Sequence, residues 1–217
     1  MQNLYNNFKL FIITLYFILI APSFLFCQWE LERVASEGRS GSIVVDSTGV
    51  IHIAYLKRPY GSDVGYAIRS NNQWTTETLT NNGEVNGIAL ALDKDQNPHI
   101  IYAEANPSDF NFFLKHITYR ENGWSSAEKL VTTESDLMTW SPKIQIDKDN
   151  HIHITYLLTD ADAGTGIIHY MTNSSGDWEN QALNDKYQNP ALYNVSMALD
   201  AEGYAHIVSY FSALGGP

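Results

Sequence analysis

The stretch DKDNHIHITY, from Asp147 to Tyr156, is the most informative part of the sequence because close variants of it occur four times. In each copy an Asp closes a short apolar run, a tight turn follows, and a His stands six positions after the Asp. A Tyr comes three or four positions after the His. The four copies are Asp46/His52/Tyr55, Asp93/His99/Tyr102, Asp147/His153/Tyr156 and Asp200/His206/Tyr210. A repeat of about 50 residues is typical of propellers and related arrays.

Short strands are predicted around every copy of this motif. Val, Ile, Thr and Tyr are abundant there, which is the signature of strands, and turn-forming Asp, Asn and Gly separate the segments. No window carries the apolar periodicity of an amphipathic helix. We therefore expect an all-β chain with four strands in each full repeat. The expected blades cover residues 37–80, 86–131, 141–184 and, in part, 194–217.

Four antiparallel strands per repeat indicate the blades of a β-propeller. Residues 28–36 alternate like a strand, and Trp29 matches the tryptophan of the later outer strands, so we expect an outer strand there that closes the ring. The chain supplies three full blades and half of a fourth, whose third strand is missing. We therefore expect a fragment of a larger ring. If the chain is complete, ring closure requires self-association.

Residues 1–27 have the pattern of a signal peptide. Lys9 precedes an apolar stretch from Leu10 to Ala21, which is shorter than the roughly 20 residues that a membrane span needs. We expect cleavage after Cys27, no stable membrane span, and a secreted or cell-surface protein, and the leader is similar to those of secreted bacterial proteins. A lipoprotein anchor at Cys27 is the alternative, although Phe26 stands where such anchors have a small residue.

Composition and charge narrow the possible partners. The 217 residues are 44% hydrophobic and 17% charged, which predicts a packed core, and their formal net charge is −11. Nucleic acids and anionic membrane surfaces attract basic patches, so neither is expected as a partner. Cys27 is the only cysteine, and the mature chain is therefore expected to have no disulfide.

With the repeat Asp-x-x-Gly/Asn-x-x-His-Ile-x-Tyr and its tryptophan-bearing outer segments, the chain resembles the BNR/Asp-box-like, or sialidase-like, propeller repeats of secreted bacterial proteins. The Asp box motif itself is only partly matched, at residues 70–74, 121–124 and 174–178. The resemblance implies a propeller fold. Sialidases are the best-known enzymes built from such blades, and they bind the carboxylate of their substrate with three arginines. No Arg-Ile-Pro stretch of the kind that marks the first sialidase blade is present, so sialidase activity is not expected.

The repeated side chains are interpreted as structural. A catalytic residue is needed once, whereas a packing residue is needed in every copy. The histidines are therefore expected to be buried and bonded to a nearby Asp or backbone carbonyl, and the tryptophans to pack between blades. These residues are Asp46, His52, Asp93, His99, Asp147, His153, Asp200, His206, Trp29, Trp74, Trp124 and Trp178.

Metal sites are considered at two places, and neither is assigned. His151 and His153 share one strand face and could hold a metal with a third ligand, but no such ligand is identifiable. The turns at residues 93–97 and 147–150 resemble the opening of a calcium loop without its glycine and closing Glu, and turn chemistry explains them. No metal, cofactor or catalytic residue is assigned. Catalysis of glycoside hydrolysis by a pair of carboxylates remains an alternative.

The expected binding face is the one that carries the long loops. Loops between second and third strands, and between blades, are long and variable, and function tends to lie on such loops. Non-repeating aromatic residues occur there: Tyr60, Phe110, Phe112, Trp140, Tyr187 and Tyr193. Rings beside Asp, Asn and Glu suit the stacking and hydrogen bonding of a sugar, although they could instead anchor the loops to the propeller.

We therefore predict a secreted, non-enzymatic propeller that binds a glycan or a cell-surface protein on its long-loop face. One alternative is a glycosidase or lyase that acts on extracellular polysaccharide at the same face. Another is a structural or adhesion module of a longer surface protein.

Overall fold

The computed structural model describes residues 30–57, 63–80, 84–106, 111–121, 123–133, 137–160, 165–184 and 192–211. The chain divides into two units, Met1–Arg33 and Val34–Pro217, and every described strand belongs to the second. The expected signal peptide lies outside the described residues. Within these ranges the chain forms strands, turns and bends and no helix, so the all-β expectation is confirmed. No segment in the described ranges has the length and apolarity of a membrane-spanning helix.

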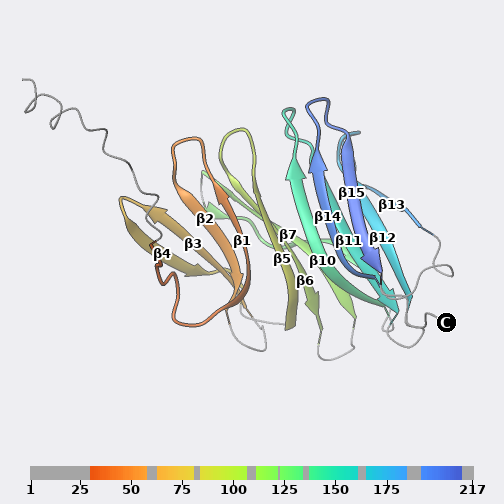
Figure 1. Ribbon diagram of the computed structural model, residues 1–217, viewed down its shortest axis with the longest axis horizontal. Helices are drawn as coiled ribbons and strands as arrows, with labels where there is room; N and C mark the ends of the chain where they lie inside the picture. Colours follow the sequence, from red (N-terminus) through yellow and green to blue (C-terminus); the bar gives the residue numbers. More distant parts are fainter. Residues whose placement is uncertain are drawn as a thin grey trace, which may run out of the picture. The chain divides into compact units, whose positions relative to one another are not determined.

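The described strands form antiparallel sheets whose members follow one another along the chain (Figure 1). The first sheet holds β1 (Arg39–Val45), β2 (Ile51–Leu56), β3 (Val64–Ser70) and β4 (Gln73–Thr78). The second holds β5 (Glu84–Leu92), β6 (Pro98–Ala105), β7 (Phe112–Arg120), β8 (Gly123–Trp124) and β9 (Glu128–Thr132). The third holds β10 (Leu137–Ile146), β11 (Ile152–Asp160), β12 (Thr165–Thr172) and β13 (Glu179–Ala182), and the fourth holds β14 (Leu192–Leu199) and β15 (Ala205–Phe211). Strand order and connections are those of successive propeller blades.

The outer strand of the second sheet is interrupted. Residues 123–130 (GWSSAEKL) are one residue longer than the matching residues 73–79 (QWTTETL). They form β8 and part of β9, which pair separately with β7. Between the two strands, the Ser125 N–H donates to the Thr118 carbonyl oxygen (2.8 Å), and Ser125 Oγ accepts from the Thr118 N–H (3.2 Å). The extra residue is thus absorbed as a local irregularity that Ser125 stabilises.

The strand expected over residues 28–36 is not formed in the part of it that the structure describes, residues 30–36. In the predicted ring its ladder partner is a third strand beside β15, and the described ranges contain no such strand. A single strand leaves its backbone N–H and C=O groups without partners, so this segment runs without regular secondary structure. Closure of a ring stays a prediction.

Apolar cores lie between successive sheets. One core joins the first and second sheets and includes Leu56 and Tyr102. Another joins the second and third sheets and includes Ile101 and Tyr156, and a smaller one joins the third and fourth sheets. Full burial of each large apolar side chain contributes roughly 1.5–3 kcal/mol. Face-to-face packing of sheets is therefore what holds the described residues together.

Trp124 on β8 and Trp178, directly before β13, pack against the preceding sheet. Trp124 meets the Tyr66 ring edge-on, at 4.8 Å between ring centroids and 74° between planes, and its Nε1–H donates to Glu77 Oε2 (3.0 Å). Trp178 meets the His116 ring at 6.5 Å and 77°. In both cases the tryptophan of one sheet covers the third strand of the sheet before it. Trp74, on the first sheet, is half-buried, and Trp29 lies outside the described residues.

Candidate functional site

The four motif aspartates cap the turns between first and second strands. In each turn one carboxylate oxygen accepts hydrogen bonds from the backbone N–H groups two and four residues later, at 2.7–3.1 Å. The residue three positions after the Asp has a positive φ. These residues are Gly49, Gln96, Asn150 and Gly203, with φ of 88°, 66°, 68° and 92°. The Asp satisfies donors that the turn leaves free, which explains why it recurs.

Side chains from two of these turns also link one sheet to the sheet before it. Gln96 Oε1 accepts from the Ser47 N–H (2.9 Å), and Asn150 Oδ1 accepts from the Lys94 N–H (3.0 Å). Each bond joins the αL residue of one turn to the backbone of the preceding turn. The tight-turn ends of the first three sheets are therefore held together by a chain of turn-to-turn hydrogen bonds.

In the first and third sheets, the motif His lies between its Asp and a Tyr of the third strand. His52 Nε2 is 3.7 Å from Asp46 Oδ2, and His52 Nδ1 is 2.5 Å from the Tyr66 hydroxyl. In the third sheet, His153 lies 3.5 Å from the carboxylate of Asp147 and 2.6 Å from the Tyr170 hydroxyl. A carboxylate beside Nε2 favours the tautomer with its proton there, so Nδ1 accepts from the tyrosine.

The second sheet departs from this arrangement because His116 stands where the other two sheets have Tyr66 and Tyr170. His99 Nδ1 is 2.9 Å from His116 Nε2, and the two rings stack at 5.1 Å and 14°. His116 Nδ1 lies 3.6 Å from Glu128 Oε2. Four ionisable side chains, Asp93, His99, His116 and Glu128, thus follow one another across the sheet.

Both histidines of this row are buried and neutral. Burial lowers the pKa of His99, although the Asp93 carboxylate acts against it. Burial also lowers the pKa of His116 to about 3, and the neighbouring His99 and Arg120 lower it further. A neutral pair can share one hydrogen bond, with one nitrogen donating and the other accepting.

A cleft of about 770 Å³ lies at the tight-turn ends of the second and third sheets. Its walls come from the β5–β6 turn, the β7–β8 turn and two turns of the third sheet. The residues that give the cleft its chemistry are Asp95, Asn97, His99, Arg120, Trp124 and Asn150. This end of the sheets is opposite to the long-loop face on which the sequence places the ligand.

Some of the polar groups that line the cleft are held by the fold. Asp93 Oδ2 accepts from Asn97 Nδ2 (3.0 Å), and Asn173 Oδ1 accepts from the Ile152 N–H (2.7 Å). By contrast, Asp95, Arg120 and Glu121 are exposed at the cleft and add two carboxylates and a guanidinium to its lining. The cleft therefore offers hydrogen-bond acceptors, a charged donor and an indole to a polar ligand.

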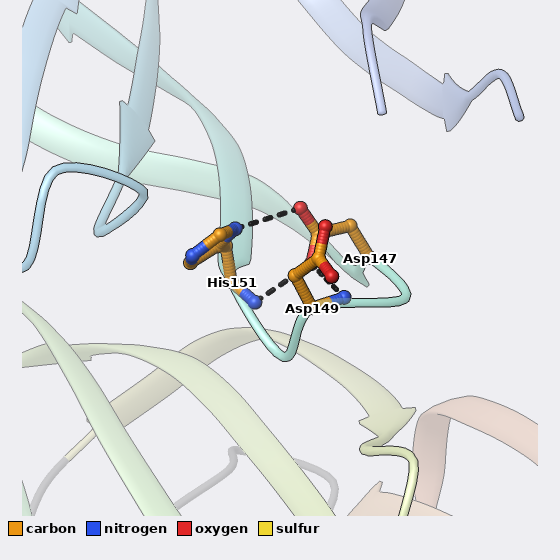
Figure 2. Close-up of side chains that lie close together, drawn as sticks. All are labelled: Asp147, Asp149 and His151. Carbon is orange, nitrogen blue, oxygen red and sulfur yellow. Dashed lines mark hydrogen bonds and ion pairs between the residues drawn. The ribbon is translucent and has the colours of Figure 1, made fainter. Parts of the chain in front are cut away.

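The turn between β10 and β11 brings together Asp147, Asp149 and His151 (Figure 2). One possible metal-ligand atom of each lies within 4.8 Å of the others. Asp147 Oδ1 accepts from the Asp149 and His151 N–H groups, and Asp147 Oδ2 is 2.9 Å from His151 Nδ1. Burial raises the pKa of Asp147, but the hydrogen bonds from His151, Asp149 and His153 outweigh it and hold that pKa at about 2. Both oxygens of Asp147 already serve the turn, so we assign this group a capping role.

The six aromatic residues predicted to bind a ligand are not brought into one described site. Phe112 begins β7 and is buried. Trp140 and Tyr193 occupy backbone positions on β10 and β14, and Tyr60, Phe110 and Tyr187 lie outside the described residues. A ligand site on the long-loop face therefore stays a prediction.

Comparison with known proteins gives no family. No family model matches the chain, and no curated protein sequence matches it. Among solved structures, it is similar to an α-L-arabinofuranosidase from Fusarium graminearum in complex with an iminosugar inhibitor, with 12% identity and a TM-score of 0.63. An ulvan lyase bound to a GlcA(1-4)Rha3S unit has 16% identity and a TM-score of 0.56. An endo-arabinase from Bacteroides thetaiotaomicron has 13% identity and a TM-score of 0.54.

These similarities extend over most of this chain but over only part of each solved structure. The aligned region covers 83% of this chain and 58% of the arabinofuranosidase, 78% of this chain and 48% of the ulvan lyase, and 83% of this chain and 74% of the endo-arabinase. The chain thus spans about half to three fifths of the first two structures. At such low identity the likeness concerns the fold, and it supports reading the four sheets as propeller blades.

Proposed function

We propose that this chain is a secreted propeller-type protein that binds a neutral polysaccharide, without turnover, in the cleft between the second and third sheets. The observation that carries the proposal is the lining of that cleft, where an indole lies among exposed carboxylate and guanidinium groups. The leader pattern of residues 1–27 supports secretion.

A sugar fits this lining because its hydroxyl groups both donate and accept hydrogen bonds. Asp95 and Glu121 can accept from hydroxyls, and Arg120 can donate to ring and hydroxyl oxygens. Trp124 offers an apolar surface to the C–H groups of a pyranose or furanose. Its ring orientation is fixed by the hydrogen bond to Glu77 and by edge contacts with Tyr66 and Tyr119, so the binding surface is preorganised.

The charge of the cleft favours a neutral glycan over an anionic one. Asp93, Asp95 and Glu121 contribute three carboxylates to the lining, whereas Arg120 is the one arginine or lysine in it. The whole chain has a formal net charge of −11. A polymer of uronic acids or sulfated sugars would meet net repulsion at this site, which is weakened but not removed by physiological salt.

The solved structures support a carbohydrate ligand, since those described above are named for enzymes that act on arabinan-type or uronic-acid polysaccharides. They also make polysaccharide cleavage the second candidate function. Prolonged incubation of the protein with a polysaccharide distinguishes binding from cleavage, because new reducing or unsaturated ends are released only if the chain is an enzyme. A protein ligand is the remaining alternative from the sequence.

The direct test is titration calorimetry of the protein with soluble linear arabinan, a neutral polymer, and with ulvan, an anionic one. We expect measurable binding to arabinan and weaker or undetectable binding to ulvan. Arg120→Ala and Asp95→Asn are each expected to weaken binding by roughly tenfold, because the first removes a charged donor and the second replaces a charged acceptor oxygen with an amide nitrogen, which cannot accept. Lys148→Ala, which alters an exposed turn residue outside the cleft lining, is the matched control.

The location of the site is decided by a third variant. If Arg120→Ala and Asp95→Asn bind arabinan as the wild type does and Trp140→Ala does not, the ligand lies on the long-loop face and the cleft assignment is wrong. Absence of binding to neutral glycans of several compositions would contradict the proposed ligand class as well.

A further inference from the structure

The repeat makes it possible to compare the same position in all four sheets, and one face of the first sheet stands out. Three residues before each motif Asp, an apolar side chain points toward the preceding sheet. In the second, third and fourth sheets it is buried: Leu90 is 7% exposed, Ile144 4% and Met197 7%. In the first sheet the matching Ile43 is 65% exposed, and Val45 beside it is 56% exposed. This face of the first sheet is uncovered within the described residues.

The opposite face of the fourth sheet is uncovered in the same way. Two residues after each motif His, the first three sheets have Ala54, Ile101 and Thr155, and all are fully buried against the next sheet. The matching Val208 on β15 is 67% exposed. The side chain of His206 is 68% exposed, whereas those of His52, His99 and His153 are at most 9% exposed.

These two faces are the two halves of an interface that the chain forms three times within itself. In each case the face that carries the motif His packs against the face that carries the residue three before the next Asp. The fourth sheet presents the first half, with His206 and Val208, and the first sheet presents the second half, with Ile43 and Val45. Ile43, Val45 and Val208 are large apolar side chains, and clusters of such side chains are normally covered in soluble proteins.

We propose that the β14–β15 face of one chain binds the β1–β2 face of a second copy, head to tail. The second copy is the occupant because the three internal interfaces are themselves contacts between repeats of this sequence, so the complementary surface is present on the chain. The turn-to-turn hydrogen bonds are not required for such packing. The interface of the third and fourth sheets forms although Gly203 occupies the place of Gln96 and Asn150.

The head-to-tail arrangement is heterologous, which gives it a specific signature. Each copy contributes a different face, so a copy with one damaged face still has the other. Ile43→Asp places a carboxylate on the β1–β2 face, and Val208→Asp places one on the β14–β15 face. Because both positions are exposed within a single chain, neither variant is expected to lower the melting temperature of the isolated chain by more than a degree or two.

The test is the molar mass of the mature chain, measured by light scattering and sedimentation over about a hundredfold range of concentration. We expect the wild-type mass to rise to at least twice that of the monomer. Ile43→Asp alone and Val208→Asp alone are expected to associate at least about a hundredfold more weakly, because burial of an unpaired carboxylate is costly. An equimolar mixture of the two variants is expected to recover a complex of one copy of each.

Ser126→Asp is the control, since it adds the same charge at an exposed position on the outer edge of the second sheet and is expected to associate like the wild type. A wild-type chain that stays monomeric throughout overturns the proposal. So does a mixture that recovers no complex, or a pattern in which one variant alone still dimerises, which would indicate two identical faces in contact. The result is independent of glycan binding, because neither variant alters the cleft.

Discussion

The interface between the first and second sheets and the interface between the second and third sheets are built on the same plan but differ at one central position. In the first, Tyr66 holds the motif His52 and packs against Trp124 at 4.8 Å. In the second, His116 takes the tyrosine's place, and its distance to Trp178 is 6.5 Å. The cleft lies at the tight-turn ends of the second and third sheets, next to the interruption in the outer strand of the second sheet. His99 and Trp124 follow the repeat and line the cleft as well as building the scaffold, whereas His116 departs from the repeat and gives the second interface a histidine pair that the first does not have.

The largest effect is expected from removing the tyrosine of the regular interface. Tyr66 is buried, and Tyr66→Ala deletes both its packing against Trp124 and its hydrogen bond to His52. We expect the free energy of unfolding, measured in urea, to fall by about 3–5 kcal/mol. His116→Ala is expected to cost less, about 1–3 kcal/mol, because a smaller side chain leaves a smaller cavity. Equal losses would mean that the two interfaces are not energetically different.

The next effect is a dependence of the unfolding free energy on pH. It arises at His116 in the second interface and has no counterpart at Tyr66 in the first. The pKa of His116 is lowered by burial from 6.5 to about 3, so below pH 6.5 the unfolded chain takes up a proton that the folded chain does not. Stability contributed by the neutral side chain is complete above pH 6.5 and falls by about 1.4 kcal/mol per pH unit down to pH 3. Unfolding free energies at pH 7 and pH 5 measure the slope.

His116→Tyr converts this position to the residue of the other two sheets and removes its share of the slope. Between pH 7 and pH 5 the variant is expected to lose about 2 kcal/mol less stability than the wild type. Burial also lowers the pKa of His52 and His99, so both proteins keep some acid sensitivity. An unchanged slope in the variant would show that His116 is not the group responsible.

The smallest effect is expected at the turn-to-turn hydrogen bonds. Gln96 accepts from the Ser47 N–H and has a φ of 66°. Gln96→Ala loses the bond and keeps the unfavourable backbone, and we expect a loss of about 1 kcal/mol. Gln96→Gly also loses the bond but relieves the backbone, so its net change is expected within about 0.5 kcal/mol of zero. Thermal unfolding of the two variants separates the contribution of the hydrogen bond from that of the backbone conformation. A larger loss of stability in Gln96→Gly than in Gln96→Ala would contradict the view that the positive φ is unfavourable for Gln96.

Much of the fold could be predicted because it depends on neighbouring residues. The first expected blade, residues 37–80, for example, contains the four strands β1 to β4, from Arg39 to Thr78. The capping role of Asp147 follows from N–H groups only two and four residues away. The expected strand at residues 28–36 is wrong for its described part, because a strand needs a partner that no local pattern reveals. The interruption after Trp124 was missed, although one extra residue in that segment is its signal.

By itself, the sequence determined the all-β class, the four repeats and the capped turns, since these follow from side-chain alternation and from hydrogen bonds within about five residues. Tertiary structure decided which residue each motif histidine meets, where the cleft opens and which two sheet faces are left uncovered among the described residues. The contacts involved join residues 14 to 17 positions apart within a sheet and about 50 apart between sheets. Their contacts depend on how the sheets pack, and the spacing of residues along the chain does not specify that packing.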